Sequence, residues 1–265
     1  MAIAYEPRRF KTTADYYVRG RLAYPDELIV RVVALTGITR DDRVLDLGCG
    51  PGFLAAAFAP YAREVVGMDP EPNMLAAARD YAARLGQKVR LMAGSSYDLT
   101  PALGSFRLVT MGRSFHWMDR AATLEKLAAL TPERSAVALF HDSHCALPEN
   151  AWQERYKAAL APYRAKDESV LQRESPDWLP HEAYLLASHF NRLERISVIR
   201  RIETPVDRLI DRALSMSVTS PEKLGENRKA LVAKLRETLE SDARNGIVTE
   251  IVESEALLGF RSPPV

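Results

Sequence analysis

The sequence predicts an α/β protein with a mostly parallel, doubly wound sheet. Short apolar runs alternate with helical patterns between Arg43 and Phe140, which is typical of repeated strand–helix–strand units. A glycine-rich turn at residues 48–52 follows the first apolar run, and Asp69 ends the second. With 265 residues and 47% apolar side chains, the chain can bury one sizeable core. We therefore expect a single domain.

The elements of this region follow from its pattern. Apolar runs predict five strands, at residues 43–47, 64–68, 88–92, 106–111 and 135–140. A short apolar helix is expected at residues 53–59, and a helical period over residues 74–85 ends at Gly86, which suits the C′ position. A third helix begins after Asp119, a natural N-cap, and stops before residues 131–132. We expect the longer helices to cover the sheet.

The alternation breaks beyond Phe140. Residues 141–193 carry tryptophans and tyrosines among charges and prolines, which predicts an inserted helical lid. A strand near 194–203 and a tail strand within 247–260 bracket two more helices. The second of these begins at Ser220-Pro221 and aligns four leucines on one face. They are Leu224, Leu231, Leu235 and Leu239.

The glycine-rich turn and Asp69 together indicate a nucleoside pocket. Alternating glycines let the backbone turn sharply and approach a ligand where a Cβ would clash. In an open α/β sheet, an acid at the end of the second strand can accept hydrogen bonds from ribose hydroxyls. The dinucleotide fingerprint would place its third glycine at Phe53, whereas here it comes one residue early, at Gly52. The sequence thus favours an adenosyl cofactor over a nicotinamide one.

The spacing Asp46-x-Gly48-x-Gly50-x-Gly52 resembles the first motif of class I S-adenosylmethionine-dependent methyltransferases. The likeness covers nearly the whole chain, most strongly residues 10–140. Residues 10–17, Arg21 and residues 24–25 match the amino-terminal cap of the small-molecule branch. Residues 94–99 and 114–119 match the segments after the third and fourth strands. In the tail, residues 215–217 and 255–261 match as well. The resemblance implies a Rossmann-like fold, with seven mostly parallel strands, an antiparallel last strand, and a helical cap and lid.

The resemblance also implies one methyltransferase domain over residues 1–265. Within it we expect an amino-terminal cap at 1–36 and a cofactor-binding core at 37–140. The helical lid insertion would occupy 141–193, and residues 194–265 would complete the sheet and its helices.

S-adenosylmethionine is the implied cofactor, with S-adenosylhomocysteine as its product. The cofactor-binding residues expected are Tyr16, Arg21, Asp46, Gly48, Gly50, Gly52, Asp69, Pro70, Ser95, Ser96 and Arg113. Asp46 can orient the loop or the amino group of the methionyl end. A cap tyrosine and Arg21 suit the methionyl carboxylate, which needs charge-assisted donors. The alternative for the tyrosines is that they pack an amphipathic helix against the sheet edge.

Two positions near the strand ends leave alternatives open. Ser95 departs from the family, where an Asp often follows this glycine and contacts the adenine amino group, so Ser95 or the backbone at Ser96 would substitute. Arg113 lies where it can clamp an anionic substrate group as well as bind the cofactor.

His116 is the candidate catalytic residue. It follows the fourth strand, so it projects into the same crevice, where a group titrating near neutrality can act as a base. The alternative is a hydrogen-bonded structural histidine beside Trp117 as a core wedge. A protein base is needed only when the acceptor is not already ionised.

Metal, nucleic-acid and membrane roles are disfavoured. Residues 141–145 offer ligand types, yet no second pair has zinc-site spacing, so no metal is expected. The chain has 36 basic and 35 acidic residues, and a formal net charge of +1 recruits neither nucleic acid nor membrane. No apolar run of about eighteen residues and no leader pattern occurs, which favours the cytoplasm.

We therefore expect methyl transfer to an oxygen or nitrogen of a small molecule, with oxygen slightly favoured. One alternative is a methyltransferase directed at tRNA or protein. Another is a non-catalytic regulator that binds S-adenosylmethionine. The sequence specifies neither the acceptor nor the oligomeric state.

Overall fold

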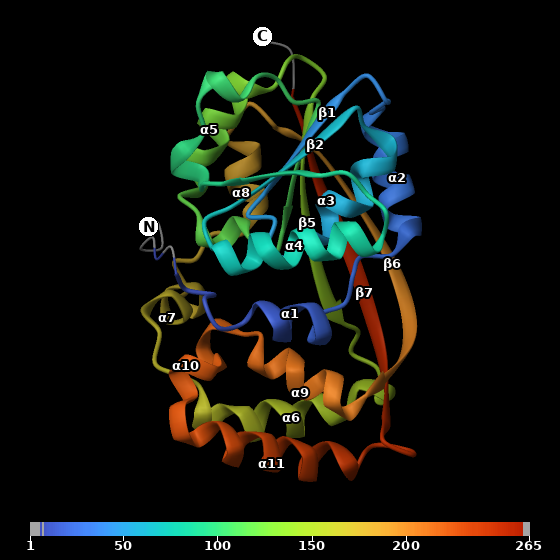
Figure 1. The fold of residues 1–265 in the computed structure, drawn as a ribbon, viewed down its shortest axis with the longest axis vertical. Coiled ribbons are helices and arrows are strands. Elements are labelled where there is room, and N and C mark those ends of the chain that lie inside the picture. The colour runs from blue at the N-terminus through green and yellow to red at the C-terminus, as the bar shows by residue number, and fades with distance from the viewer. Residues whose placement is uncertain (1–5, 7, 262–265) are drawn as a thin grey trace.

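A single seven-stranded sheet organises the protein (Figure 1), whose computed structural model describes residue 6 and residues 8–261. The strands are β1 (Arg43–Leu47), β2 (Glu64–Asp69), β3 (Arg90–Ala93), β4 (Leu108–Gly112), β5 (Ala136–His144), β6 (Arg192–Pro205) and β7 (Ile247–Phe260). Their order is β3-β2-β1-β4-β5-β7-β6, and β7 is antiparallel to both of its neighbours. The first five strands pair in parallel. The predicted seven-stranded, mostly parallel sheet is confirmed.

Both faces of the sheet are covered by helices. One face packs against α2 (Asp26–Thr36), α3 (Phe53–Phe58) and α4 (Pro72–Arg84), and the other against α5 (Arg120–Leu130) and α8 (His181–Leu186). Successive strand residues point to opposite faces. In β4, Leu108 accordingly joins the core on the α2 face, while Val109 joins the core on the α5 face. Burial on both sides explains why the inner strands β1, β2 and β4 are mostly apolar.

Two predicted helix ends are confirmed. Gly86 has a φ of +65° just beyond α4, and its N–H donates to the carbonyl of Ala83 at 3.0 Å. At the start of α5, the carboxylate of Asp119 accepts the N–H of Ala122 at 3.1 Å. These helix ends could be predicted from the sequence because a helix terminus is specified by a few neighbouring residues.

A separate helical layer lies beyond the carboxyl ends of the parallel strands (Figure 1, lower half). It contains α1 (Ala14–Gly20), α6 (Trp152–Leu160), α9 (Val206–Leu214), α10 (Pro221–Leu224) and α11 (Arg228–Glu240), packed around its own apolar cluster. The short helix α7 (Glu168–Glu174) lies beside this layer in the same view. The long strands β6 and β7 connect the layer to the sheet. A Cβ on Gly20 would lie only 2.3 Å from the backbone nitrogen of Arg212, so this glycine lets α1 and α9 cross closely.

The arrangement of the later helices differs from the sequence-based expectation. Strand β5 continues to His144, so residues 141–193 do not begin as a lid. Helix α8 lies in that range but covers the sheet, where Leu185 is fully buried. Most of the helical layer comes instead from residues 206–240, between β6 and β7. The apolar pattern marks these segments as helices but does not say which surface each one covers.

The helix expected to begin at Ser220 is divided in two. Helix α10 ends at Leu224, and α11 begins at Arg228. Gly225 lies between them with a φ of +51°, a left-handed conformation that breaks the helix. The three leucines of α11 are still buried on one face, as predicted.

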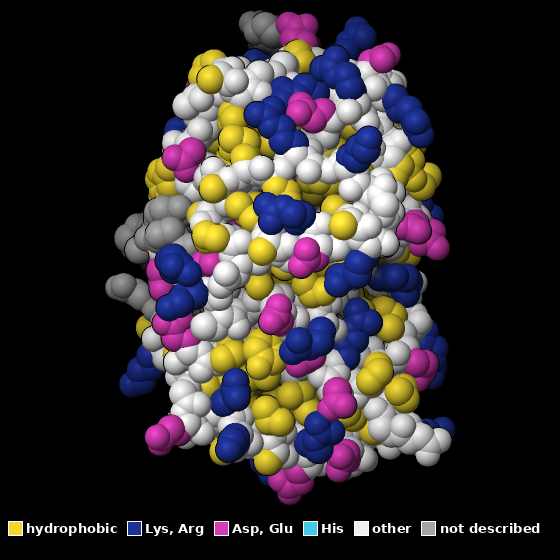
Figure 2. Space-filling model, viewed as in Figure 1, with side chains coloured by type: hydrophobic (Ala, Val, Ile, Leu, Met, Phe, Trp, Pro, Cys, Tyr) yellow, Lys and Arg dark blue, Asp and Glu magenta, His cyan; other side chains and the backbone are white. Residues whose placement is uncertain are grey.

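The surface carries mixed charges. On the face shown in Figure 2, Lys and Arg side chains are interspersed with Asp and Glu. Within the described part of the chain, no helix is both long and apolar enough to cross a bilayer.

Candidate cofactor and acceptor site

The loop between β1 and α3 uses its three glycines in three different ways. A Cβ on Gly48 would lie 2.6 Å from the Cβ of Ser114, whereas a Cβ on Gly50 would meet nothing within 4 Å. A Cβ on Gly52 would lie 3.0 Å from the Cβ of Ala78 in α4. All three glycines have φ between +51° and +79°, where other residues are strained. Gly48 therefore permits packing, Gly50 borders open space, and Gly52 brings α3 and α4 together.

Two buried carboxylates hold this loop in place. Asp69 accepts the N–H of Gly50 at 2.8 Å and that of Glu71 at 2.9 Å. Asp46 accepts the N–H of Ala55 at 2.9 Å and the hydroxyl of Thr110 at 2.9 Å. Asp46 thus orients the turn into α3, one of the two roles the sequence left open.

Neither carboxylate has a cationic partner among these contacts, and burial dominates its ionisation. Burial raises the pKa of Asp69 to about 6, against the opposite effect of the two backbone donors. It raises the pKa of Asp46 to about 7 for the same reason. Both groups would gain from further hydrogen-bond donors.

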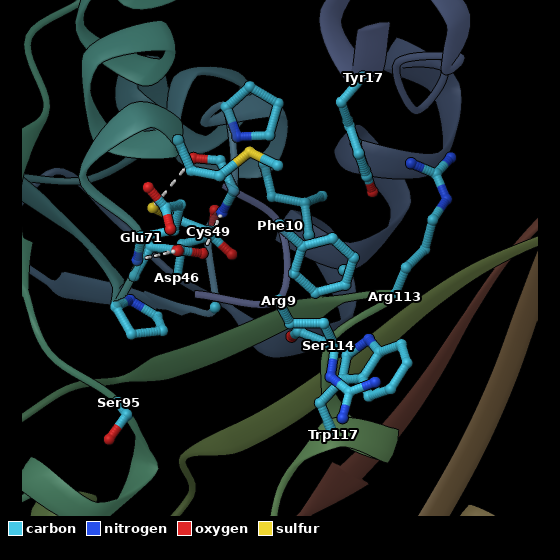
Figure 3. A pocket seen from close by; sticks show the side chains of 18 of the residues that line it. Arg9, Phe10, Tyr17, Asp46, Cys49, Glu71, Ser95, Arg113, Ser114 and Trp117 are labelled. Atoms are coloured by element: carbon cyan, nitrogen blue, oxygen red, sulfur yellow. Dashed lines mark hydrogen bonds between the residues drawn. The ribbon is translucent and has the colours of Figure 1, made fainter. Parts of the chain in front are cut away.

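A cavity opens beside the loop, at the carboxyl ends of β1, β2 and β4 (Figure 3), and we call it the glycine-loop cavity. Eight of the sequence-predicted cofactor residues line it: Asp46, Gly48, Gly50, Asp69, Pro70, Ser95, Ser96 and Arg113. Gly52 does not, because its role is the contact with α4. Four further lining residues, Phe10, Tyr17, Glu71 and Met74, were not assigned to the cofactor by the sequence. Glu71 could have been identified from the sequence by its position two residues after Asp69.

The hydroxyl of Ser95 is already engaged. It donates to Asp98 at 2.8 Å, and the Ser95 N–H donates to the same carboxylate oxygen at 2.8 Å. The Tyr97 N–H in turn donates to the Ser95 hydroxyl at 3.2 Å. Ser95 is therefore the cap of a short helical turn at the edge of the cavity, and Ser96 lines the cavity beside it.

The amino-terminal cap contributes Tyr17 rather than Tyr16. Tyr17 lines the glycine-loop cavity, and Tyr16 packs into the helical layer with the Arg19 guanidinium 4.9 Å from its ring centroid. Neighbouring residues of a helix point about 100° apart, so only one of two adjacent tyrosines can face the cavity. Arg21 also lies outside the glycine-loop cavity, and its Nε donates to the hydroxyl of Ser215 at 2.8 Å. The structure thus places Tyr16 and Arg21 outside the cavity in which the sequence led us to expect them.

The segment before α1 closes one side of the same cavity. Its Arg8 pairs with Glu71 at 3.2 Å, and the carbonyl of Lys11 accepts the side-chain N–H of Asn73 at 2.7 Å. Phe10 packs edge-on against Trp117, with ring centroids 5.6 Å apart, and the two rings are neighbours in Figure 3.

A second cavity lies between the ends of β4 and β5 and the helices α1, α6 and α9, and we call it the helical-layer cavity. It shares Phe10, Tyr17, Arg113 and Trp117 with the glycine-loop cavity. The two cavities therefore adjoin at these four side chains.

Arg113 stands at this junction in a constrained conformation. Its φ is +56°, and its N–H donates to the carbonyl of Phe140 at 3.0 Å. The guanidinium pairs with Asp142, donates to the carbonyl of Leu22 at 3.1 Å and lies 4.6 Å from the ring centroid of Tyr24. Left-handed backbone in a non-glycine residue is strained and tends to occur at functional sites. The charge of Arg113 is already balanced, which weakens its expected role as an anion clamp.

His116 lines the helical-layer cavity and not the glycine-loop cavity. Burial lowers the pKa of its imidazole well below the usual range, and the charge of Arg173 acts in the same direction. This environment disfavours the charged imidazole, whereas the sequence led us to expect titration near neutrality. Its ring centroid lies 4.7 Å from that of Trp117.

His144, at the end of β5, belongs to a buried charge network. His144 Nε2 lies 2.7 Å from Glu250, which also accepts hydrogen bonds from Arg212 at 2.5 and 3.0 Å and from Thr204 at 2.5 Å. Glu250 is completely buried. Across residues 6 and 8–261, no group of three His, Cys, Asp or Glu side chains is placed to hold a metal ion.

A parallel sheet whose first loop is held by a carboxylate from the second strand, beside a cavity at the strand ends, defines a nucleoside-binding α/β protein. Residues 44–133 match a family model described as a methyltransferase domain. An uncharacterized methyltransferase of Mycobacterium bovis is 33% identical over 119 residues, which are 45% of this chain and 46% of the relative. A Bacillus subtilis methyltransferase, YcgJ, is 29% identical over 108 residues, 40% of this chain and 43% of the relative. The matches thus span less than half of these relatives.

Solved structures agree on the fold. A methyltransferase from Geobacter sulfurreducens, crystallised with S-adenosylhomocysteine, superposes with a TM-score of 0.52 at 16% identity, covering 97% of this chain and 98% of that chain. Residues 44–133 therefore carry a methyltransferase domain, and the fold is that of class I S-adenosylmethionine-dependent methyltransferases, as the sequence predicted. S-adenosylmethionine is the cofactor of that class.

Proposed function

We propose that this protein transfers a methyl group from S-adenosylmethionine to an oxygen or nitrogen of a small molecule. The observation that carries the proposal is the wall shared by the two cavities, formed by Phe10, Tyr17, Arg113 and Trp117. A cofactor in the glycine-loop cavity and an acceptor in the helical-layer cavity would meet at these residues.

In this proposal Asp69 binds the ribose hydroxyls. Its two oxygens each accept one backbone N–H, and a carboxylate has about four lone-pair sites, so acceptor capacity remains. Gly50 borders open space, so its backbone can approach the nucleoside.

The other lining residues suit the two ends of the cofactor. Pro70 and Met74 offer apolar surface to the adenine, and the backbone at Ser96 can bond its edge, since the Ser95 hydroxyl is engaged. The hydroxyl of Tyr17, which also interacts with the Arg113 guanidinium, would bind the methionyl end, a role the sequence gave to Tyr16.

The chain contributes mainly by positioning. S-adenosylmethionine held beside Asp69 and Gly50 would supply an electrophilic methyl group for in-line attack by an acceptor lone pair, with S-adenosylhomocysteine as the leaving group and any acceptor proton passing to solvent. Holding two reactants in this geometry is worth an effective molarity of about 10⁵ M or more. We propose that the neutral His116 imidazole orients the acceptor by a hydrogen bond, because its lowered pKa makes it a weak base.

The surroundings of the acceptor cavity favour a small molecule over a macromolecule. Helices α1, α6 and α9 wall the cavity on the side away from the sheet, and we propose that the helical layer, rather than residues 141–193 alone, is the lid. The formal net charge of +1 also gives the chain little overall electrostatic attraction for nucleic acid.

The test is a transfer assay with methyl-labelled S-adenosylmethionine and three acceptor pools: small metabolites, tRNA and protein. We expect label in the metabolite pool, and its loss in the Asp69→Ala variant. Label confined to tRNA or protein would establish a macromolecular acceptor instead. Tight binding of S-adenosylhomocysteine with no label in any pool would favour the non-catalytic regulator.

A further inference from the structure

The helical-layer cavity is strongly basic. Six cationic side chains line it, namely Arg21, Arg113, Lys157, Arg164, Arg173 and Arg212, and Asp142 is the one acidic lining residue. Much of the remaining wall is aromatic or aliphatic. That part includes Trp117, Trp152, Leu160, Met216, Val218 and Val252.

Most of these cations are balanced by carboxylates of the protein. Arg113 pairs with Asp142. Arg212 pairs with Glu250 at 2.5 Å. Lys157 and Arg164 lie nearer the surface and pair with Glu154 at 3.1 Å and Glu174 at 3.2 Å. Arg173 lies 4.5 Å from the ring centroid of Trp117, and the charges of Asp167 and Glu174 stabilise its charged form.

Arg21 differs from the others because no described carboxylate lies within ion-pair distance of it. Its Nε donates to the Ser215 hydroxyl, which is itself fixed by donating to the carbonyl of Arg212 at 2.6 Å. The Tyr17 ring lies 5.4 Å from the guanidinium carbon. The protein thus binds the Nε of the guanidinium, and the two terminal nitrogens remain able to bind a ligand in the cavity.

The surroundings make this lone cation costly. Burial lowers the pKa of Arg21, and the like charges of Arg113 and Arg212 lower it further. Arg21 is half-buried, and a charge partly withdrawn from water is destabilising unless it is paired, so an anion bound at Arg21 would supply the missing partner.

We propose that the methyl acceptor is a small organic acid with an apolar body, and that Arg21 binds its carboxylate. This inference rests on the proposed function and names its substrate class. A single unbalanced cation matches a single negative charge, which favours a carboxylate over a phosphate monoester carrying nearly two. The planar guanidinium fork also fits a carboxylate with two parallel hydrogen bonds.

The location of Arg21 assigns it an anchoring role. Arg21 lines the helical-layer cavity but not the glycine-loop cavity, whereas the methyl group would pass at the four shared residues. The acid therefore carries a separate oxygen or nitrogen that reaches the junction while its carboxylate stays at Arg21. The apolar body lies against the wall containing Trp152 and Leu160.

The first experiment separates acids from other metabolites. A metabolite extract is divided by anion exchange into acidic and non-acidic pools, and part of the acidic pool has its carboxyl groups converted to methylamides. With S-adenosylhomocysteine present, we expect only the untreated acidic pool to raise the melting temperature. With labelled S-adenosylmethionine, we expect label only from that pool. Stabilisation and label that persist after amidation, or that come from the non-acidic pool, would overturn the proposal. A melting shift from the acidic pool without any label would instead count against methyl transfer.

The second experiment uses Arg21→Gln, with Arg21→Lys as the charge-conserving variant and Lys157→Gln as a matched control in the same cavity. For the acid isolated above, we expect Arg21→Gln to raise KM about 10- to 100-fold, with Arg21→Lys intermediate and affinity for S-adenosylhomocysteine unchanged. The preference for the acid over its amide should disappear in Arg21→Gln and persist in Lys157→Gln.

A stability measurement distinguishes anchoring from a structural role. Without ligand, Arg21→Met removes an unbalanced charge and should leave the melting temperature unchanged or higher, whereas Arg212→Met breaks the pair with Glu250 and should lower it. An equal loss in both variants would make Arg21 a structural residue and overturn the proposal.

Discussion

The carboxylate of Asp69 accepts the N–H of Gly50 at 2.8 Å, so the end of β2 holds the loop that follows β1. The same carboxylate borders the glycine-loop cavity, and Gly50 has open space beside it. One side chain therefore shapes the loop and faces the proposed ribose position. Loss of this group should affect the cofactor before it affects the acceptor.

Asp69→Ala should weaken binding of S-adenosylhomocysteine about 10- to 100-fold, because hydrogen bonds to a charged group contribute about 1.5–3 kcal/mol. Isothermal titration calorimetry measures the change directly. Asp80→Asn, at an exposed position of α4, is the control and should bind as the parent does. Unchanged affinity in Asp69→Ala would remove this residue from the cofactor site.

Cofactor affinity should also depend on pH through Asp69. Burial raises its pKa to about 6 in the free protein, and the ribose hydroxyls would bind the ionised form. Affinity for S-adenosylhomocysteine should therefore be full above pH 7 and fall as the pH drops below 6. The Asp69→Asn variant cannot titrate at this position, so its weaker affinity should be flatter between pH 5 and 7. A parent profile without that fall would contradict the assignment.

Alanine at Gly50 and at Gly52 should have separable effects. A Cβ at Gly52 meets Ala78, so Gly52→Ala should lose stability to both crowding and backbone strain. A Cβ at Gly50 meets no protein atom within 4 Å, so Gly50→Ala should lower the free energy of unfolding only by the backbone strain, about 1–2 kcal/mol. The same Cβ should block binding of the cofactor. Urea denaturation and calorimetry on both variants test this. The idea fails if Gly50→Ala binds S-adenosylhomocysteine normally.

Glu250 should determine how strongly the protein is destabilised at acid pH where the helical layer meets the sheet. Burial alone would raise its pKa, but hydrogen bonds from His144 and Arg212 lower it to about 2. Because the folded pKa lies below the ordinary value of 4.5, its stabilisation is present above pH 4.5 and lost as the pH falls toward 2.

Glu250→Gln should accordingly lower the free energy of unfolding at pH 7 by about 3 kcal/mol and flatten its fall between pH 4.5 and 2. Urea titrations across that range measure both effects. Glu203→Gln, on the exposed face of β6, should change neither. Equal acid sensitivity in Glu250→Gln and the parent would assign the loss to other groups.

The cofactor half of the molecule was predictable because its signals are local. Gly48, Gly50 and Asp69 are specified by a few residues around two strand ends, and parallel strands bring such ends to one edge. The roles of Tyr17 and Gly52 were not predictable in this way. Adjacent tyrosines differ only in the direction they face on α1, and Gly52 is required by Ala78, which lies 26 positions further along the chain.

The acceptor half depends on contacts that no short pattern encodes. Residues 206–240 form most of the helical layer because β6 and β7 carry them beyond the sheet, whereas α8 returns to cover it. Arg21 was expected at the cofactor, but the hydroxyl of Ser215, far along the chain, holds it in the other cavity. Its lack of a carboxylate partner could be recognised only after the helices were placed.

His116 provides the last prediction. Burial lowers the pKa of its imidazole well below the ordinary value of 6.5, so the methylation rate should show no inflection near pH 6.5 attributable to His116. If His116 orients the acceptor, His116→Gln should retain more activity than His116→Ala, because an amide can still donate and accept a hydrogen bond. Initial rates with acceptors of graded pKa separate the two roles: a base matters most for the least acidic nucleophile, whereas an orienting group affects all of them alike. We expect His116→Ala to slow every acceptor by a similar factor and to leave affinity for S-adenosylhomocysteine intact. A loss concentrated on weakly acidic acceptors, together with an inflection that disappears in the variant, would instead establish His116 as the base.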